Sequence, residues 1–414
     1  MDDIKICEFV DTFYPTVDGA INVVKHYSET LNKKVTCKIA APKPARREKY
    51  IDDETFEVIR CSSVGAPEKY RSGFPDMDAK FVERIVGEKF DVLHAQTPFM
   101  MGRFAIKIGK KHKIPVVATL HTQYHLDFER TLKGNKALTK FMVNFISKVY
   151  KKADSVWTVS NKACEFLRLY GYKGPIEVVR NATEYSYPEN AEELVERINK
   201  IHNLDGQRNV FIFVGRMAWY KNIGLICDAL KIVKDNGKDF KMLFVGGGFD
   251  LERLKKYAKK IGVDDRIIFT DEVKDRELLQ AYYLRSDLML FPSTFDTAGV
   301  VKVEAAAHKK AGIFVKDSCS SELVEDNVNG FLCLENAQSL AERILDVCDK
   351  EDYLKQIGEN AYKMLYKSWD MLADEVLEKY RKIIEDYKEK QRKRYRRKHL
   401  LRLIRKNKKS SLAG

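Results

Sequence analysis

The run Val-Phe-Ile-Phe-Val at residues 210–214 decides the fold class, and Lys-Met-Leu-Phe-Val at residues 241–245 repeats its pattern. Both runs are apolar without alternation, which is typical of strands that helices cover on both faces of a parallel sheet. Similar short runs alternate with helical patterns along the chain, and this order predicts βαβ units in an α/β fold. The predicted strands are 4–10, 35–41, 56–61, 91–95, 116–121, 155–160 and 176–181 in a first set, and 210–214, 241–246, 266–270, 287–291 and 313–316 in a second.

A polar stretch at residues 184–207 separates the two sets of strands, and an acidic helix is expected within it at 191–201. We therefore predict two Rossmann-like domains that face a cleft. Open parallel sheets bind ligands at the carboxyl ends of their strands, so the cleft is the expected ligand site. The predicted division is a first domain over 1–183, a linker over 184–207, a second domain over 208–370, a helix over 371–387 and a basic tail over 388–414.

The net charge of +14 is concentrated at one end of the 414-residue chain. Residues 388–409 contain 13 of the 74 Lys and Arg residues and one of the 60 Asp and Glu residues. The rest of the chain has 61 basic and 59 acidic residues, so it is nearly neutral. The basic character therefore belongs to the tail and not to the domains.

Composition argues against several classes of protein. No apolar run approaches the roughly 20 residues that span a bilayer, and the acidic start at residues 1–5 does not have the pattern of a signal peptide. The eight cysteines are scattered without a CxxC pair. We therefore expect reduced thiols in a cytosolic protein and no structural zinc site.

Two cations follow the strand at 210–214, namely Arg216 and Lys221. A guanidinium fork and an ammonium at a strand-to-helix turn suit a diphosphate. The alternative is that both are solvated loop charges.

The segment from Asp296 to Glu304 is the strongest constellation in the second domain. A helix is expected to begin near Gly299, so the amides of Gly299, Val300 and Val301 would form an anion site. Glu304 could accept hydrogen bonds from two vicinal hydroxyls, and Asp296 from a sugar hydroxyl. The alternative is that Asp296 only caps the helix and Glu304 is a surface charge.

In the first domain, His121 lies at the carboxyl end of the strand at 116–121, where it could donate to or polarise a reacting group. His94 occupies a similar place on the preceding strand. We expect it to contact residues of the site without touching the substrate. Gly19 lies at a helix start, where a backbone can approach phosphate or sugar closely. The alternative for His121 is a structural role.

Together these motifs resemble the retaining glycosyltransferases of family 4, which have the GT-B fold. The resemblance covers about residues 4–370 and rests on the order of its motifs. These are YPTVDG at 14–19, LHTQYH at 120–125, VGRMAWYKN at 214–222, VGGG at 245–248, the acidic pair at 296 and 304, and LVEDNVNGFL at 323–332.

The resemblance implies an acceptor-side first domain and a second domain that binds a nucleotide-sugar, UDP- or GDP-hexose, as co-substrate without a cofactor or metal. Arg216 and Lys221 would then bind the diphosphate, assisted by Gly19 and the amides near Val300. Glu304 would bind the ribose, and backbone near Val273 the base. Asp296 would contact the donor sugar, and His121 would lie beside the transferring carbon.

Two departures from the family pattern bear on the choice of sugar. Asp296 stands where the family usually has Glu, and Ala182 follows Asn181 where Gly is usual.

Asp76-Met77-Asp78 resembles the DxD metal motif of the other glycosyltransferase fold, but it follows Phe74-Pro75 and is interpreted as a turn.

The basic segments favour a membrane-lipid acceptor, with a diacylglycerol glucosyltransferase as the nearest analogue. Residues 388–409 are predicted to bind an anionic membrane. Residues 131–152, which contain six Lys and no acid, are a second candidate or an ordinary domain helix. We expect a cytoplasmic protein held at the inner face of the plasma membrane. The alternatives are a soluble glycosyltransferase that acts on sugar or polysaccharide, and a nucleic-acid-binding protein that uses its tail, although no nucleic acid is expected as a partner.

Overall fold

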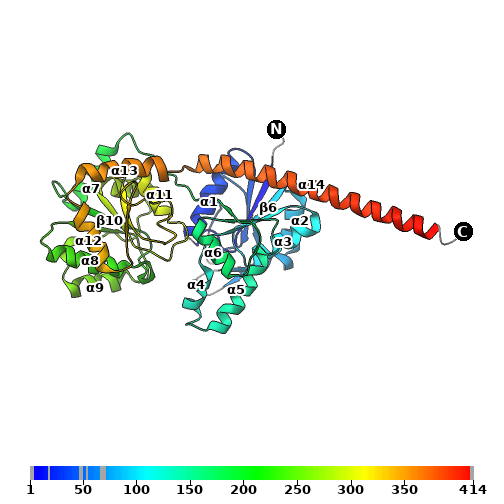
Figure 1. Ribbon diagram of the computed structural model, residues 1–414, viewed down its shortest axis with the longest axis horizontal. Coiled ribbons are helices and arrows are strands. Elements are labelled where there is room, and N and C mark those ends of the chain that lie inside the picture. The colour runs from blue at the N-terminus through cyan, green and yellow to red at the C-terminus, as the bar shows by residue number, and fades with distance from the viewer. Residues whose placement is uncertain (1–3, 17–18, 46–49, 53–54, 66–70, 411–414) are drawn as a thin grey trace.

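The computed structural model describes residues 4–16, 19–45, 50–52, 55–65 and 71–410, which form two α/β domains side by side (Figure 1). The first domain contains a seven-stranded parallel sheet of order β3-β2-β1-β6-β7-β8-β9. Its strands are β1 Lys5–Phe9, β2 Thr36–Pro42, β3 Val58–Cys61, β6 Val92–Ala95, β7 Val116–Leu120, β8 Ser155–Thr158 and β9 Glu177–Val178.

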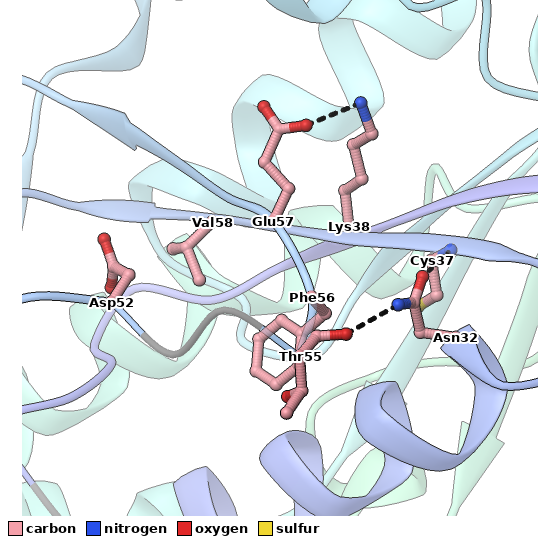
Figure 2. A pocket seen from close by; sticks show the side chains of 8 residues that line it. All are labelled: Asn32, Cys37, Lys38, Asp52, Thr55, Phe56, Glu57 and Val58. Carbon is pink, nitrogen blue, oxygen red and sulfur yellow. Dashed lines mark hydrogen bonds and ion pairs between the residues drawn. The ribbon is translucent and has the colours of Figure 1, made fainter.

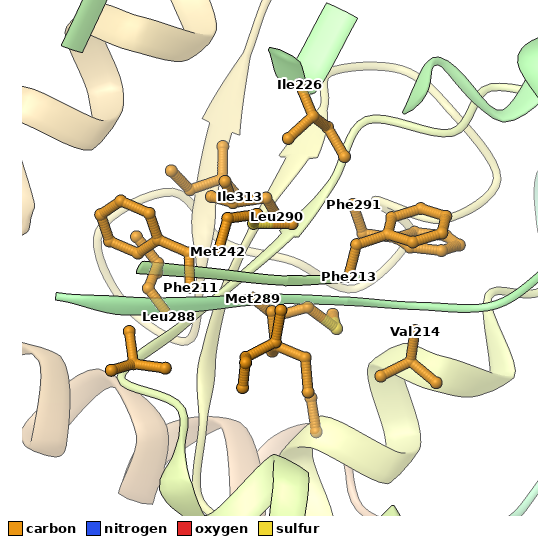
Figure 3. Packing of buried hydrophobic residues seen from close by; sticks show 14 of the residues in the cluster. Phe211, Phe213, Val214, Ile226, Met242, Leu288, Met289, Leu290, Phe291 and Ile313 are labelled. Carbon is orange, nitrogen blue, oxygen red and sulfur yellow. The ribbon is translucent and has the colours of Figure 1, made fainter. Parts of the chain in front are cut away.

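The second domain contains a six-stranded parallel sheet of order β12-β11-β10-β13-β14-β15. Its strands are β10 Val210–Val214, β11 Lys241–Val245, β12 Ile267–Phe269, β13 Leu288–Phe291, β14 Ala311–Val315 and β15 Phe331–Cys333. All five residues of β10 are buried, as its unbroken apolar sequence predicts. Figure 3 shows the packing around it, where the rings of Phe213 and Phe291 stack with centroids 5.6 Å apart.

Helices connect the strands in both domains. In the first they are α1 Gly19–Asn32, α2 Ala79–Gly87, α3 Met100–His112, α4 Tyr124–Thr131, α5 Lys136–Tyr150 and α6 Asn161–Leu169. In the second they are α7 Ala191–His202, α8 Ile223–Asp235, α9 Leu251–Ile261, α10 Arg276–Arg285, α11 Val300–Ala307, α12 Ala337–Val347 and α13 Glu351–Leu365, and α14 Trp369–Ser410 follows. Short 3₁₀ turns occur at η2 Pro75–Met77, η3 Trp219–Lys221 and η4 Asp264–Arg266. The predicted fold class, two Rossmann-like domains, is confirmed.

Some short strands were not predicted from the sequence. Strand β15 was not among the predicted strands, and it extends the second sheet by pairing with β14. A small antiparallel pair, β4 Ser63–Gly65 and β5 Arg71–Gly73, was also not predicted. Three-residue strands carry too little hydrophobic pattern to be recognised without their pairing partners.

The range 184–207, which we predicted as a linker, contains α7, and this helix packs against α10 of the second domain. Leu194 and Ile198 of α7 are buried in the core of that domain. Helix α7 therefore contributes to the second domain, although it precedes that domain's first strand.

The chain returns to the first domain through α14, which crosses over that domain and projects beyond it (Figure 1). The first turns of α14 pack on α1 and on β8 in a buried group that we call the α14 cluster. Its members include Tyr27, Leu31, Trp157, Leu372, Val376, Leu377 and Tyr380. The helix then continues without interruption through the range 388–410, all of which we had predicted to belong to a separate tail, and an Lys393–Glu389 pair one turn apart supports the helix.

The α14 cluster should contribute strongly to the stability of the first domain. Leu377 is 4% exposed, so Leu377→Ala should lower the free energy of unfolding by about 2–5 kcal/mol through lost burial and a cavity. Met371 on the same helix is 55% exposed, and Met371→Ala should change it by less than about 0.5 kcal/mol. Urea unfolding followed by tryptophan fluorescence measures both. Equal effects would show that α14 does not depend on this packing.

Candidate functional site

The two domains meet where the loop after β13, residues 293–299, lies against the carboxyl ends of β7 and β8. The hydroxyl of Thr297 donates to the backbone carbonyl of His121. Ser160, just after β8, donates to the carbonyl of Thr297 over 2.7 Å, and the Gln123 amide donates to the carbonyl of Phe295 over 2.8 Å. These contacts set the backbone of His121 in the first domain against the loop of the second domain that carries Asp296.

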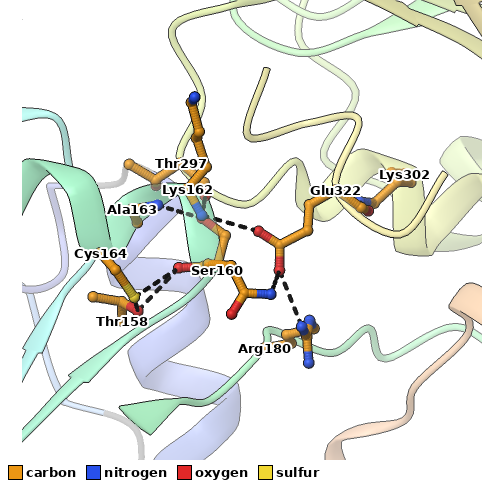
Figure 4. Close-up of polar contacts among 10 residues, drawn as sticks. Thr158, Ser160, Lys162, Ala163, Cys164, Arg180, Thr297, Lys302 and Glu322 are labelled. Atoms are coloured by element: carbon orange, nitrogen blue, oxygen red, sulfur yellow. Dashed lines mark hydrogen bonds and ion pairs between the residues drawn. The ribbon is translucent and has the colours of Figure 1, made fainter. Parts of the chain in front are cut away.

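A second polar contact joins the domains through Glu322, whose side chain is 13% exposed (Figure 4). Its carboxylate pairs with Arg180 at 3.0 Å and accepts from the side chain of Asn161 at 2.9 Å and the amide of Lys162 at 3.2 Å. The sequence analysis did not single out Glu322. The signal was available, because Glu322 directly precedes the LVEDNVNGFL segment.

Lys221 and Asp296, which were predicted to bind different parts of the donor, form an ion pair. The Lys221 Nζ lies 2.7 Å from Asp296 Oδ1, and the Ser293 hydroxyl donates to Asp296 Oδ2 over 2.5 Å. Both charged side chains are largely shielded from solvent, with exposed fractions of 15% and 23%. Asp296 is therefore held by a cation and a hydroxyl at the domain junction, and its role as a simple helix cap is not seen.

Glycines bring the loops after β10 and β11 into close contact. Gly246 has φ of +131°, and a Cβ there would lie 2.3 Å from the carbonyl oxygen of Gly215. A Cβ on Gly248 would lie 2.3 Å from the carbonyl oxygen of Met217. These positions require glycine on steric grounds. Arg216 is exposed within this pair of loops, at the same end of the sheet as Lys221.

Helix α11 begins directly after Gly299, which has φ of +59°. The amides of Val300 and Val301 open the helix and have no intrahelical acceptor before them. A Cβ on Gly299 would lie 3.3 Å from Ser320, whose buried hydroxyl has no hydrogen-bond partner among the residues that the structure describes. This hydroxyl was not predicted and adds a polar group beside the helix start, where an anion is favoured.

Glu304 is bound by a buried tyrosine. The Tyr283 hydroxyl donates to Glu304 Oε2 over 2.7 Å, and burial raises the pKa of Glu304 despite that bond. Arg276 opposes the rise in the pKa of Glu304, and it also pairs with Glu184 at 3.2 Å. The alternative that Glu304 is a solvated surface charge is therefore wrong.

His121 is half-buried, and its Nε2 lies 2.6 Å from Oε1 of Gln96. Burial, with a smaller contribution from His94, lowers the pKa of His121 to about 3. The ring is therefore neutral at physiological pH. His94 is fully buried behind the site, within hydrogen-bonding distance of Thr119 and Tyr380, as expected for a residue that supports the site from behind.

Other predicted residues lie in open or peripheral places. Gly19 is the first residue of α1, with open space around the position of an added Cβ. Val273 is half-buried in the segment after β12, where Glu272 approaches Gly247. Asp78 caps α2 by accepting from the amide of Phe81, which agrees with its interpretation as a turn residue.

A cavity of about 510 Å³ lies elsewhere, at the β2–β3 edge of the first sheet (Figure 2). The side chain of Asn32 donates to the carbonyl of Thr55 in its wall, and Lys38 pairs with Glu57. Strands β1 and β6 separate it from β7. The cavity is therefore not part of the site around His121.

Two family matches cover most of the chain. Residues 17–186 match the family described as Glycosyltransferase Family 4, and residues 195–364 match Glycosyl transferases group 1. This chain is a family-4 glycosyltransferase of the GT-B fold. The two matches meet between residues 186 and 195, close to the junction of the two sheets.

Named relatives of this glycosyltransferase include two lipid-modifying enzymes. The alpha-monoglucosyldiacylglycerol synthase of Acholeplasma laidlawii is 26% identical over 86% of this chain and 92% of its own length. The enzyme of the same name from Streptococcus pneumoniae is 26% identical over 80% of this chain and 75% of its own.

Solved structures confirm the fold of the glycosyltransferase. Anabaena HepE, in complex with UDP and glucose, superposes with a TM-score of 0.71 at 17% identity over 91% of this chain and 99% of its own. Sucrose-phosphate synthase of Thermosynechococcus elongatus gives a TM-score of 0.74 at 16% identity over 92% of this chain and 100% of its own.

The low pKa of His121 makes the stability of the glycosyltransferase depend on pH. In the unfolded chain His121 takes up a proton below about pH 6.5, whereas in the folded protein it does so only near pH 3. Its contribution to stability is therefore intact above pH 6.5 and is lost as the pH falls from 6.5 toward 3. Relative to His121→Asn, the wild type should lose up to about 1.4 kcal/mol of unfolding free energy per pH unit in that window.

Urea unfolding at half-unit steps from pH 7.5 to 5 measures this loss for both proteins. A difference between wild type and variant that stays constant over the whole range would contradict a neutral, buried His121.

Proposed function

We propose that this glycosyltransferase transfers a hexose from UDP- or GDP-hexose to a membrane-lipid acceptor such as diacylglycerol, with retention of anomeric configuration and without a bound metal. The observation that carries the proposal is the junction of His121 with the Asp296 loop, where Thr297 donates to the backbone of His121 and Asp296 pairs with Lys221. Support for the acceptor comes from the two diacylglycerol-glucosylating relatives.

On the donor side, we assign the diphosphate to Arg216, Lys221 and the amides that open α11, with Gly19 facing it from the first domain. Negative charge develops on the leaving oxygen as the bond to the sugar breaks. The two cations and the start of α11 stabilise that charge, and they supply what a metal would otherwise contribute. Glu304 holds the ribose through its oxygen that does not accept from Tyr283, and backbone near Val273 contacts the base.

At the sugar, the transition state should have oxocarbenium character. Asp296 contacts a sugar hydroxyl, and its ion pair with Lys221 makes it a weak nucleophile. We therefore favour attack by the acceptor on the face of the sugar from which the nucleotide leaves, assisted by the leaving phosphate. A covalent sugar adduct on Asp296 would contradict this route.

On the acceptor side, we propose that two basic elements bind an anionic membrane surface at the cytoplasmic face. Helix α14 carries the residues of 388–409 away from the domain body as one rod (Figure 1), and its side chains at 392–397 are exposed. Among the described residues, none of the helices combines the length and the apolar composition needed to cross a bilayer.

The second basic element is α5, which projects from the first domain next to α4 (Figure 1). The range 131–152, predicted as one basic helix, breaks at Lys133 and Gly134, both with positive φ. The second half of α5 is an ordinary domain helix, with Ile146 and Val149 buried. Its first half exposes Leu138 and Phe141, which is 63% exposed, beside exposed lysines. We assign this half to the membrane surface.

The donor assignment predicts a large loss of transfer on removing the Lys221 charge. Lys221→Met should lower kcat about 100- to 1,000-fold, because one stabilising group for the leaving diphosphate is lost. Lys231, which pairs with Asp235 on the solvent side of α8, supplies the matched control, and Lys231→Met should keep full activity. The assay screens UDP- and GDP-hexoses for hydrolysis and for transfer to diacylglycerol. Full transfer by Lys221→Met would refute the assignment.

The membrane assignment predicts that charge on α14 governs vesicle binding. Replacing Arg392, Lys393, Arg394, Arg396 and Arg397 by Gln should weaken binding to anionic vesicles at least about 100-fold, since each basic residue contributes about 1 kcal/mol. Donor hydrolysis in solution should not change. Cosedimentation with phosphatidylglycerol vesicles measures the loss, and neutral phosphatidylcholine vesicles are the control.

Unchanged sedimentation of this variant with anionic vesicles would favour a soluble glycosyltransferase acting on sugar or polysaccharide. Salt-sensitive binding of the wild type to duplex DNA in preference to vesicles would favour the nucleic-acid alternative.

A further inference from the structure

A buried chain of polar side chains runs from α14 to His121. The Tyr380 hydroxyl of α14 lies 3.0 Å from Oε1 of Glu8 on β1. The Gln96 amide nitrogen lies 2.7 Å from Oε2 of Glu8, and the Gln96 oxygen lies 2.6 Å from Nε2 of His121. Glu8, Gln96 and Tyr380 are 0%, 3% and 0% exposed.

The sheet explains why these side chains meet. Glu8 and His94 are opposite one another in the β1–β6 register, and Gln96 follows two residues after His94. Side chains two apart in an extended segment share a face, so Glu8, His94 and Gln96 point to the same side, toward α14. His121 follows the adjacent strand β7, one position beyond its last residue.

The donors and acceptors in this row of buried side chains can be assigned in order. Glu8 accepts one hydrogen bond from the Tyr380 hydroxyl and one from the Gln96 nitrogen. A carboxamide has one donating end and one accepting end. Because the donating end of Gln96 is committed to Glu8, its oxygen faces His121, and the hydrogen in that contact must come from Nε2 of His121.

We propose that Gln96 is a positioning residue that holds His121 as the Nε2–H tautomer, and that Glu8 and Tyr380 of α14 fix the orientation of Gln96. The Nδ1 atom of His121 then carries a lone pair and accepts a hydrogen bond from a substrate hydroxyl, whereas from the sequence we expected His121 to donate to or polarise a reacting group. The kinetic consequence rests on the proposed function, but the tautomer does not depend on it.

His94 and Tyr27 also contact members of this hydrogen-bond chain, and Nδ1 of His94 lies 3.3 Å from Oε2 of Glu8. Nδ1 of His94 lies 2.5 Å from the Tyr380 hydroxyl and 3.3 Å from the Gln96 nitrogen, and its Nε2 lies 2.7 Å from Thr119. The Tyr27 hydroxyl lies 3.0 Å from that of Tyr380. Only the Gln96 oxygen contacts the His121 ring among the hydrogen bonds of the described residues.

The wild-type protein itself provides the first test. Long-range ¹H–¹⁵N spectra of protein labelled with ¹⁵N-histidine distinguish protonated from unprotonated ring nitrogens, and the His121 signals are assigned by their loss in His121→Asn. We expect Nε2 to be protonated and Nδ1 to be unprotonated at pH 7. The opposite tautomer would require a protonated Glu8 donating to a reversed Gln96 amide, and it would overturn the proposal.

Variants then test which residue fixes the tautomer. Glu8→Gln should produce a mixture of His121 tautomers. A Gln side chain at position 8 can donate as well as accept, so the Gln96 amide can take either orientation. Gln96→Met should do the same and should lower kcat about tenfold with KM within twofold, since substrate contacts remain but one hydrogen bond to the ring is lost. Tyr27→Phe, which removes a hydroxyl that does not touch Glu8, should keep the wild-type tautomer.

Unaltered His121 signals in both folded variants, Glu8→Gln and Gln96→Met, would refute the positioning role. If the tautomer changes as expected while transfer activity is absent from the wild type with every donor, the failure lies in the proposed function and not in the hydrogen-bond chain.

Discussion

The contact between the Asp296 loop and the carboxyl ends of β7 and β8 is the constraint on which the site depends. Four hydrogen bonds fasten that loop to the first domain, and three of them, one from Ser160 and two from Gln123, end on backbone carbonyls of the loop. Because backbone atoms are held, the position of Asp296 is set by the path of the chain. The ion pair with Lys221 then fixes the carboxylate itself. A site divided between two domains needs such a fastening, since placement errors of about 1 Å can cost 100-fold in rate.

Helix α14 has two roles that its length makes possible. Its first turns are buried against the first domain, and Tyr380 reaches the polar chain behind His121. Its later turns project away from the body as a basic helix. The element proposed to meet the membrane is thus the same helix that contributes a hydrogen bond to the interior of the first domain.

Much of the polar chemistry lies inside the protein and not in solvent. Glu304, Glu322 and the Lys221–Asp296 pair are all shielded, and each has a hydrogen-bond partner. Buried polar groups that are paired in this way hold one geometry, because any alternative leaves a group unsatisfied. The protein itself therefore holds these side chains of the candidate site in one geometry. The same principle gives the Gln96 amide a single orientation.

The sequence by itself determined the two parallel sheets, because unbroken apolar runs such as 210–214 only suit strands covered on both faces. It also predicted His121, Lys221, Asp296 and Glu304 as site residues, since each lies in a loop or helix that follows a recognisable strand. It could not show that Lys221 pairs with Asp296, that Tyr283 binds Glu304, or that Tyr380 reaches Glu8 across 372 positions. Only the tertiary structure decided these contacts, because hydrophobic periodicity reports which face of an element is buried and not which distant side chain lies against it.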